Sequence, residues 1–279
     1  MATVAFFHAH PDDEAISTGG TMARLADAGH RVVLVCATDG SRGEAVAGSV
    51  PAGSTLAAVR AAELDAAAGV LGVDRAERLG YRDSGMAGAE TNDDPDCFWQ
   101  ADPASAAARL AGLLAGLEVD LLTVYDANGG YGHPDHIQVH RVGHRAAARV
   151  GIPAVEAVMN RDHLLAVMEA ALEAGVADID EEAMAERRRA AEEGRFGVPA
   201  TAITHAVDVT GVLERKRAAL ACHRSQIGDD SFFLRLPPEA FAASFGTEWF
   251  VDRRRRGGPP YSADLLDVLD VAGTGGGAR

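Results

Sequence analysis

The sequence of 279 residues is 47% hydrophobic, so it is long enough to bury a sizeable core in one large domain. Its 26 basic and 41 acidic side chains give a formal net charge of −15, which repels phosphate backbones and argues against nucleic acid as a partner. Its three cysteines, at positions 36, 97 and 222, lack C-x-x-C spacing, which argues against a disulfide framework or a thiolate zinc site.

Strands and helices alternate along the first two-thirds of the chain. Short β-rich or apolar runs predict strands at Thr3–His8, Arg31–Ala37, Arg78–Tyr81, Val119–Tyr125 and Pro153–Val158. Helical patterns predict helices at Ala15–Ala28, Ser54–Leu71, Pro103–Leu117 and His133–Val150. Such alternation implies a mainly parallel sheet with helices on both faces, so we expect a Rossmann-like three-layer α/β/α fold.

The rest of the chain follows a different pattern. Arg161–Arg195 is charged and rich in Ala and Glu, which predicts a helical insertion. Ile203–Val209 predicts a strand and Gly211–Cys222 a helix, as parts of a smaller C-terminal segment. Residues 273–279 are low in complexity, and we expect a disordered tail there after a single domain over residues 1–272.

The N-terminus lacks the basic region of a signal peptide, and no apolar stretch of the sequence is long enough to cross a bilayer. We therefore expect a cytoplasmic protein with no membrane partner. A homo-oligomer is compatible with the sequence, which does not indicate an oligomeric state.

The first motif is His-Pro-Asp-Asp-Glu at His10–Glu14, after the first predicted strand and at the start of a helix. A simple reading is helix capping, because proline suits the first turn and carboxylates there meet the positive end of the helix dipole. Capping explains one or two acids, but not three acids after a histidine that ends a buried strand. Carboxylates packed this closely need a cation or donors to offset their charge.

The second motif, His-Pro-Asp-His at His133–His136, also opens a predicted helix and follows a strand across the Gly-rich loop 128–132. In open α/β sheets the carboxyl ends of parallel strands meet at the crevice where ligands bind, so we expect the two motifs to converge. Imidazole and carboxylate without thiolate favour zinc, with other divalent metals as alternatives.

The segments Ala9–Glu14 (A-H-P-D-D-E) and Gly129–His136 (G-G-Y-G-H-P-D-H) resemble the PIG-L/LmbE-like zinc deacetylases, and the likeness covers most of the chain. Four further landmarks fit: Gly43-Glu44, Arg60–Leu64, Tyr81–Met86 and His223–Gln226. Within the family, the likeness is closer to the N-acetylglucosaminyl-inositol deacetylases of mycothiol biosynthesis and to the mycothiol conjugate amidases.

This resemblance implies that His10, Asp13 and His136 bind zinc. It also implies hydrolysis of an N-acyl amide on an amino sugar or glycoconjugate, with N-acetyl as the expected acyl group. This reaction releases a free amine and a carboxylate.

The resemblance assigns roles to four neighbouring residues. Asp12 would be the general base that activates water, and His133 would stabilise or protonate the reacting centre. Asp135 would hold the His133 imidazole. Tyr131 would polarise the acyl oxygen or help the leaving amine, although it could instead pack the Gly-rich loop.

Three family positions that contact sugar hydroxyls match Arg60, Asp83 and Glu44, whose charged groups make strong hydrogen bonds to polyols. Each has an alternative. Arg60 could lie on the surface paired with Glu63, and Asp83 could serve a turn. Glu44 lies in the loop 38–44, where the register of the match could shift.

Three other histidines have two readings each. His8 faces the same side of its strand as His10, so it could support the site, but we favour a core histidine with satisfied hydrogen bonds. His140 and His144 continue at helical spacing from His136, and such stripes are more often packing or solvated residues than ligands.

Two other functions remain open from the sequence. The insertion and the segment Phe196–Pro199 favour an amidase that cleaves a larger thiol-conjugate amide, although no lysine follows the acids of the first motif as conjugate amidases tend to have. A non-catalytic sugar- or nucleotide-binding α/β protein is the second alternative. Its phosphate cradle would be the loop 38–44, which lacks the G-x-G-x-x-G or G-K-[ST] pattern.

Overall fold

The computed structural model describes residues 1–173 and 181–273, and within them seven strands form one sheet in the order β3-β2-β1-β4-β5-β7-β6. The strands are β1 (Thr3–His8), β2 (Arg31–Thr38), β3 (Arg75–Tyr81), β4 (Leu121–Tyr125), β5 (Ala154–Val158), β6 (His205–Asp208) and β7 (Thr247–Val251). The first five strands pair in parallel, and β7 is antiparallel to both of its neighbours, β5 and β6. The predicted mainly parallel sheet is confirmed.

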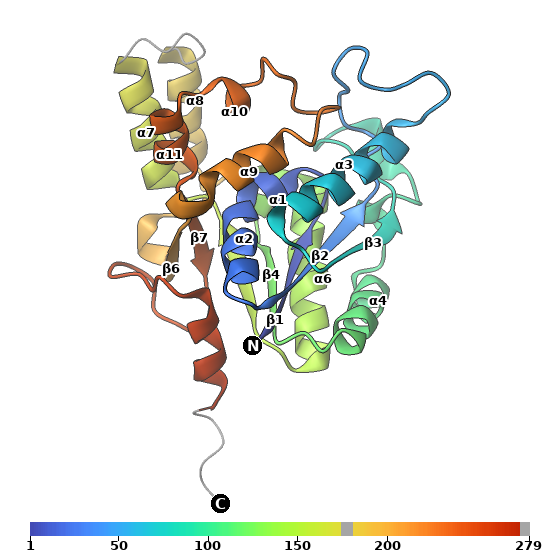
Figure 1. Ribbon diagram of the computed structural model, residues 1–279, viewed down its shortest axis with the longest axis vertical. Coiled ribbons are helices and arrows are strands. Elements are labelled where there is room, and N and C mark those ends of the chain that lie inside the picture. The colour runs from blue at the N-terminus through green and yellow to red at the C-terminus, as the bar shows by residue number, and fades with distance from the viewer. Residues whose placement is uncertain (174–180, 274–279) are drawn as a thin grey trace, which may run out of the picture.

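Helices cover both faces of the sheet, which confirms the three-layer fold (Figure 1). The α-helices are α1 (Asp13–Ser17), α2 (Gly19–Asp27), α3 (Leu56–Leu71), α4 (Pro103–Gly116), α5 (Gly129–Gly132), α6 (Pro134–Val150), α7 (Arg161–Glu173), α8 (Glu181–Glu192), α9 (Leu213–Leu220), α10 (Phe232–Arg235) and α11 (Pro238–Phe245). The 3-10 helices are η1 (Glu90–Asp93), η2 (Phe98–Gln100), η3 (Ala200–Ala202), η4 (Thr210–Val212) and η5 (Leu265–Gly273). Among the described residues, none of these helices is long and apolar enough to cross a lipid bilayer.

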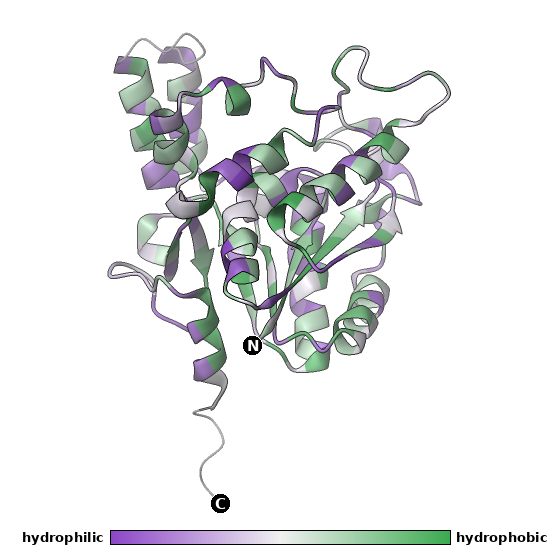
Figure 2. Ribbon diagram, viewed as in Figure 1, coloured by the Kyte–Doolittle hydropathy of each residue, from purple (hydrophilic) through white to green (hydrophobic). Residues whose placement is uncertain are grey.

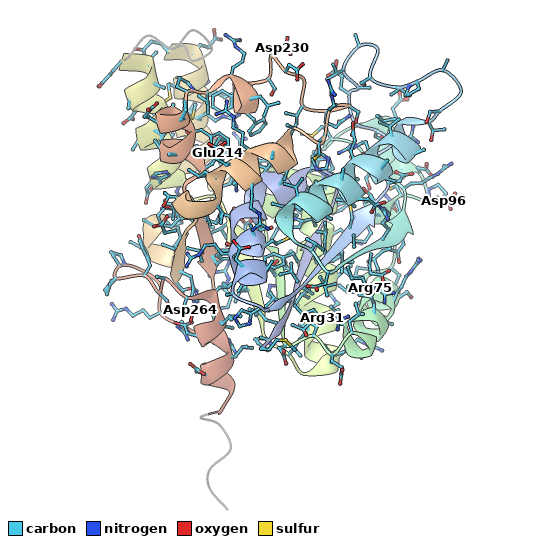
Figure 3. The ribbon with its side chains drawn as sticks, in the orientation of Figure 1. Arg31, Arg75, Asp96, Glu214, Asp230 and Asp264 are labelled. Atoms are coloured by element: carbon cyan, nitrogen blue, oxygen red, sulfur yellow. The ribbon has the colours of Figure 1, made fainter. Side chains whose placement is uncertain are left out.

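The strand β1 separates two apolar cores because alternate side chains of a strand point to opposite faces. Val4 and Phe6 pack with residues of α2, α3 and α9, whereas Ala5 and Phe7 pack with residues of α4 and α6. Figure 2 colours the inner strands mainly towards the hydrophobic end of the scale. Exposed charged side chains lie around the outside in Figure 3, for example Arg75, Asp96, Glu214, Asp230 and Asp264.

Two of the differences from the sequence-based prediction concern the first helix and the strand β7. The predicted helix Ala15–Ala28 is two helices separated at Thr18, whose hydroxyl bonds the buried His8 ring 2.8 Å away. The antiparallel strand β7 was not predicted. A buried ion pair between Lys216 and Glu248 ties it to α9, and the Glu248 carboxylate also accepts the backbone N–H of Gly20 at 2.8 Å.

The helices α7 and α8 lie in the predicted insertion. They stand at the end of the sheet where the strands β1 and β4 finish, and the long loop after β2 rises at the same end (Figure 1). Apart from Gly273, the tail predicted to be disordered lies outside the described residues. The single-domain organisation over residues 1–272 stays a prediction.

The helix α6 approaches the sheet closely because Gly143 has no side chain. A Cβ added at Gly143 would lie 2.3 Å from Cγ1 of the buried Val124 in β4. We expect Gly143→Ala to lower the free energy of unfolding by about 1–3 kcal/mol, measured by urea denaturation.

The matched control is Gly112→Ala in α4, where an added Cβ has nothing within 4 Å. This change removes backbone freedom without a clash, so it should raise stability by about 0.5–1 kcal/mol. Equal effects of the two substitutions would contradict the close packing of α6 on β4.

Candidate metal centre

The two His-Pro-Asp segments meet at one end of the sheet. His10 and Asp13 follow the end of β1, and His136 lies in the first turn of α6, which follows β4. Because β1 and β4 are hydrogen-bonded neighbours in parallel, their carboxyl ends lie side by side. The predicted convergence of the two segments is therefore what the structure shows.

Asp13 lies between the two histidines. Its Oδ2 atom is 3.3 Å from Nδ1 of His10 and 3.3 Å from Nε2 of His136. Two ligands of a tetrahedral zinc, each about 2.1 Å from the ion, lie about 3.4 Å apart. His136 Nε2 is also buried without a hydrogen-bond partner among the described residues. These three donors fit a divalent metal in both spacing and chemistry.

His133 offers a second arrangement of ligands. One nitrogen each of His10, His133 and His136 lies within 4.8 Å of the others. His133 Nδ1 accepts the backbone N–H of Asp135 at 3.1 Å, so a neutral ring carries its proton on Nε2. Burial, with the neighbouring His10 and His136, lowers the pKa of His133 to about 4. The ligand set with Asp13 stays a prediction, because both sets fit the positions of the donors.

The Asp135 carboxylate differs in role from the sequence-based expectation. Its Oδ2 atom lies 3.1 Å from His10 Nε2 and accepts the Ser84 backbone N–H at 2.9 Å, and Oδ1 accepts the Ser84 hydroxyl. The expectation that this carboxylate holds the His133 ring is corrected, because the Asp135 backbone amide makes that contact. When Nε2 of a neutral His10 ring donates to this carboxylate, the lone pair is on Nδ1, the nitrogen on the side of Asp13.

Asp12 has a backbone conformation that is rare outside glycine, with φ 122°. Arg60 donates to its Oδ2 at 2.9 Å, and Glu14 accepts its backbone N–H at 2.9 Å. Burial raises the pKa of Asp12 to about 6 although Arg60 acts in the opposite direction. These contacts therefore hold Asp12 in a strained backbone conformation, with its carboxylate beside the three donors.

The centre is rich in buried negative charge. Burial alone would raise the pKa of Asp13, but His136 and His10 hold it well below its usual range. Burial would lower the pKa of His10, but Asp13, Asp135 and Asp83 raise it well above its usual value. The carboxylates around His10 thus favour a positive charge at this point, which is a proton on the ring without a metal and the ion itself when a metal is bound.

The three predicted sugar-binding residues occupy different places. Arg60 is 3% exposed and bonds Asp12, so its alternative reading as a surface partner of Glu63 is wrong. Asp83 is buried, 3.5 Å from His10 Nε2, and His10 lowers its pKa although burial opposes this. Glu44 is exposed in the loop after β2, and its contact with the sugar stays a prediction.

A cavity of about 240 Å³ opens beside the metal centre. Asp13, His136 and Tyr131 form one side of it, and the side chains of β5, β7, α7 and α11 form most of the rest, mainly apolar. Tyr131 is 44% exposed, and its ring centre lies 5.1 Å from that of His136. Tyr131 therefore stands at the edge of the cavity, next to the proposed ligands.

Tyr125 supports the centre and was not singled out from the sequence. Its ring stacks on His136 with 4.5 Å between ring centres, and its hydroxyl lies 2.6 Å from His8 Nδ1. His8 is thus a core histidine with satisfied hydrogen bonds, as favoured, and it also orients the residue that packs on His136. The available signal was its position at the end of a buried strand, just before the Gly-rich loop that leads to His133.

His223, the first residue of the family landmark His223–Gln226, forms a buried ion pair with Glu14. Burial would lower the pKa of His223, but Glu14 raises it. Because Glu14 also accepts the backbone N–H of Asp12, this ion pair helps to hold Asp12 in its strained conformation.

Comparison with known sequences gives one family. The model of the family PIG-L, GlcNAc-PI de-N-acetylase, matches residues 5–147. The 1D-myo-inositol 2-acetamido-2-deoxy-alpha-D-glucopyranoside deacetylase of Acidothermus cellulolyticus is 37% identical over 99% of this chain and 98% of its own. The protein of the same name from Salinispora arenicola is 40% identical over 95% of this chain and 91% of its own.

Comparison with solved structures gives the same fold. N,N'-diacetylchitobiose deacetylase from Pyrococcus horikoshii has a TM-score of 0.54 at 21% identity, over 89% of this chain and 82% of its own. The 4-carboxy-2-hydroxymuconate hydratase from Pseudomonas putida has a TM-score of 0.58 at 17% identity, over 92% of this chain and 98% of its own. Since these names describe different reactions, the shared fold does not by itself assign a reaction.

The contact between Asp135 and His10 leads to a test. We expect Asp135→Asn to weaken metal binding about 10- to 100-fold, because the His10 ring loses the carboxylate that orients it and raises its basicity. Metal affinity is measured by competition with a chelator of known strength.

The control is Asp65→Asn, which changes an exposed carboxylate paired with Arg78. Its metal affinity should equal that of the wild type. Unchanged affinity in Asp135→Asn would show that this carboxylate does not support a ligand.

Proposed function

Because the chain belongs to the PIG-L family of GlcNAc-PI de-N-acetylases, we propose that it removes the acetyl group from an N-acetylglucosamine linked to inositol, using zinc. The family and the curated relatives are named deacetylases, so the chain is an enzyme that hydrolyses an N-acetyl amide. The specific substrate rests on the relatives' names and on their match to nearly the whole chain. The main structural support for this chemistry is that Asp13 lies 3.3 Å from both His10 and His136, which come from the two His-Pro-Asp segments.

In this proposal His10, Asp13 and His136 hold the ion. A zinc ion bound there would lower the pKa of a water molecule and polarise the acyl oxygen of the substrate. The absence of thiolate from this donor set leaves other divalent metals as alternatives, because imidazole and carboxylate also suit them.

Asp12 is the proposed general base. Its carboxylate lies next to Asp13 in sequence, and Arg60 fixes its Oδ2. The other oxygen can take a proton from the attacking water, and the strained backbone holds it in one orientation. Arg60 therefore orients the base, in addition to the sugar contact proposed for it.

His133 and Tyr131 are the proposed donors to the substrate. The proton of neutral His133 is on Nε2, because Nδ1 accepts the Asp135 amide, so Nε2 can donate a hydrogen bond to the developing oxyanion. Protonation of the leaving nitrogen by His133 requires the imidazolium form of the ring. The Tyr131 hydroxyl at the edge of the cavity can donate to the acyl oxygen.

We place the sugar hydroxyls against Asp83 and Arg60, which are charged groups beside the centre. Exposed Glu44 would meet the part of the substrate farthest from the amide.

The cavity favours a second candidate. Its mainly apolar wall extends past the ligands Asp13 and His136 between β5, β7 and α11, with more space than an acetyl group needs. An amidase that cleaves a bulkier acyl group, such as that of a thiol conjugate, would use this space.

Substitution of the two proposed proton-transfer groups separates catalysis from metal binding. We expect Asp12→Asn and His133→Ala each to lower kcat about 10²- to 10⁴-fold and to keep the zinc content of the wild type. Asp27→Asn, at an exposed ion pair with Arg215, is the control and should change neither. Loss of zinc from His133→Ala would instead make His133 a ligand.

A substrate panel separates the two candidates. N-acetylglucosaminyl-inositol should give free amine faster than substrates with bulkier acyl groups, detected with an amine-reactive dye. Faster release from a thiol-conjugate amide would contradict the deacetylase and support the amidase. No release from any substrate by the zinc-loaded protein would contradict both.

A further inference from the structure

A second group of metal-ligating side chains lies between α6 and β5. Besides the catalytic centre, one ligand atom each of His140, His144 and Glu156 lies within 4.8 Å of the others. Neither the proposed mechanism nor the family comparison uses these residues. We propose that His140, His144 and Glu156 bind a second divalent transition metal, zinc above all.

The helix places the two histidines on one face. Residues four apart on a helix are neighbours, and the ring centres of His140 and His144 are 4.6 Å apart. Glu156 comes from the neighbouring strand β5, so the donors join two elements of the fold. Two imidazoles and one carboxylate form a donor set that zinc uses in proteins, with a fourth position open to water.

The distances suit such an ion. Glu156 Oε1 lies 3.3 Å from His144 Nε2, and one ring nitrogen of His140 lies within 4.8 Å of both other donors. Two ligands of a tetrahedral zinc are about 3.4 Å apart, so small side-chain movements would complete the geometry. Nδ1 of His140 donates to the Tyr125 carbonyl oxygen at 2.9 Å, which orients the ring and leaves the lone pair on Nε2 for a metal.

The pKa shifts of two of the donors suit a metal site. Burial lowers the pKa of His140, which favours the neutral ring. Glu156 is 1% exposed, and although burial would raise its pKa, His144 and Arg253 lower it, so it stays ionised. A buried charged carboxylate that faces two imidazole rings is a strong position for a cation.

The local charge also favours a cation. Asp126 is buried near this group, and its Oδ2 atom has no hydrogen-bond partner among the described residues. Glu156 raises the pKa of Asp126 and His140 lowers it, although burial is the larger cause of its rise. When Asp126 and Glu156 are both ionised, the single guanidinium of Arg253 beside them leaves one negative charge uncompensated.

Arg253 is the competing cation. Its Nε donates to Glu156 Oε2 at 2.9 Å, on the oxygen that the histidines do not contact. Its side chain is 56% exposed, so it can turn towards solvent when a metal binds. Without a metal, the cluster is a hydrogen-bonded group in which His144 and Arg253 satisfy Glu156. The metal site and the hydrogen-bonded group therefore predict different numbers of metal ions bound per chain.

The test counts ions. The full-length protein is dialysed against buffered Zn²⁺, and zinc per chain is measured by elemental analysis. We expect two ions in the wild type and one in His144→Ala, with deacetylase activity of the variant within twofold of the wild type. One ion in the wild type, or two in His144→Ala, would overturn the proposal.

Arg253→Gln tests the same site without removing a ligand. Loss of the competing guanidinium should tighten binding of the second ion about tenfold and leave the first unchanged. Unchanged or weaker binding of the second ion would contradict the proposal. Because the variant keeps all three donors, its result does not depend on whether His144→Ala folds.

Discussion

The structure depends on the need to balance buried negative charge at the carboxyl end of β1. Four carboxylates surround the His10, His133 and His136 rings: Asp12, Asp13, Asp83 and Asp135. Arg60 balances part of this charge through Asp12. Burial of an unpaired carboxylate costs several kcal/mol, so the arrangement is stable when a proton or a metal ion supplies the remaining positive charge.

The fold serves this requirement by bringing distant parts of the chain to one end of the sheet. Parallel pairing of β1 with β4 sets the two His-Pro-Asp segments side by side, and the close approach of α6 to β4 fixes the position of His136. On the other side, the pair of Lys216 with Glu248 anchors β7 to α9, and this strand helps to form the cavity beside Asp13. The same contacts that stabilise the sheet therefore shape the space for a substrate.

Local sequence patterns predicted the parallel half of the sheet and the convergence of the motifs, because buried strands and helix starts have strong local signals. They did not predict β7, since Thr247–Val251 is short and gains its place through Lys216 and β5, which are distant in sequence. They also missed the partner of the Asp135 carboxylate. Its contact with His10 joins residues 125 positions apart, and no spacing rule reports such a distance.

The central claim is that Asp13 joins His10 and His136 around a divalent metal while His133 stays free for catalysis. The most direct measurement is a crystal structure of the protein loaded with one equivalent of zinc, with anomalous data at the zinc edge. The account predicts one strong peak within bonding distance of His10 Nδ1, Asp13 Oδ2 and His136 Nε2. A peak bonded by His133 in place of Asp13, or a peak away from both motifs, would contradict it.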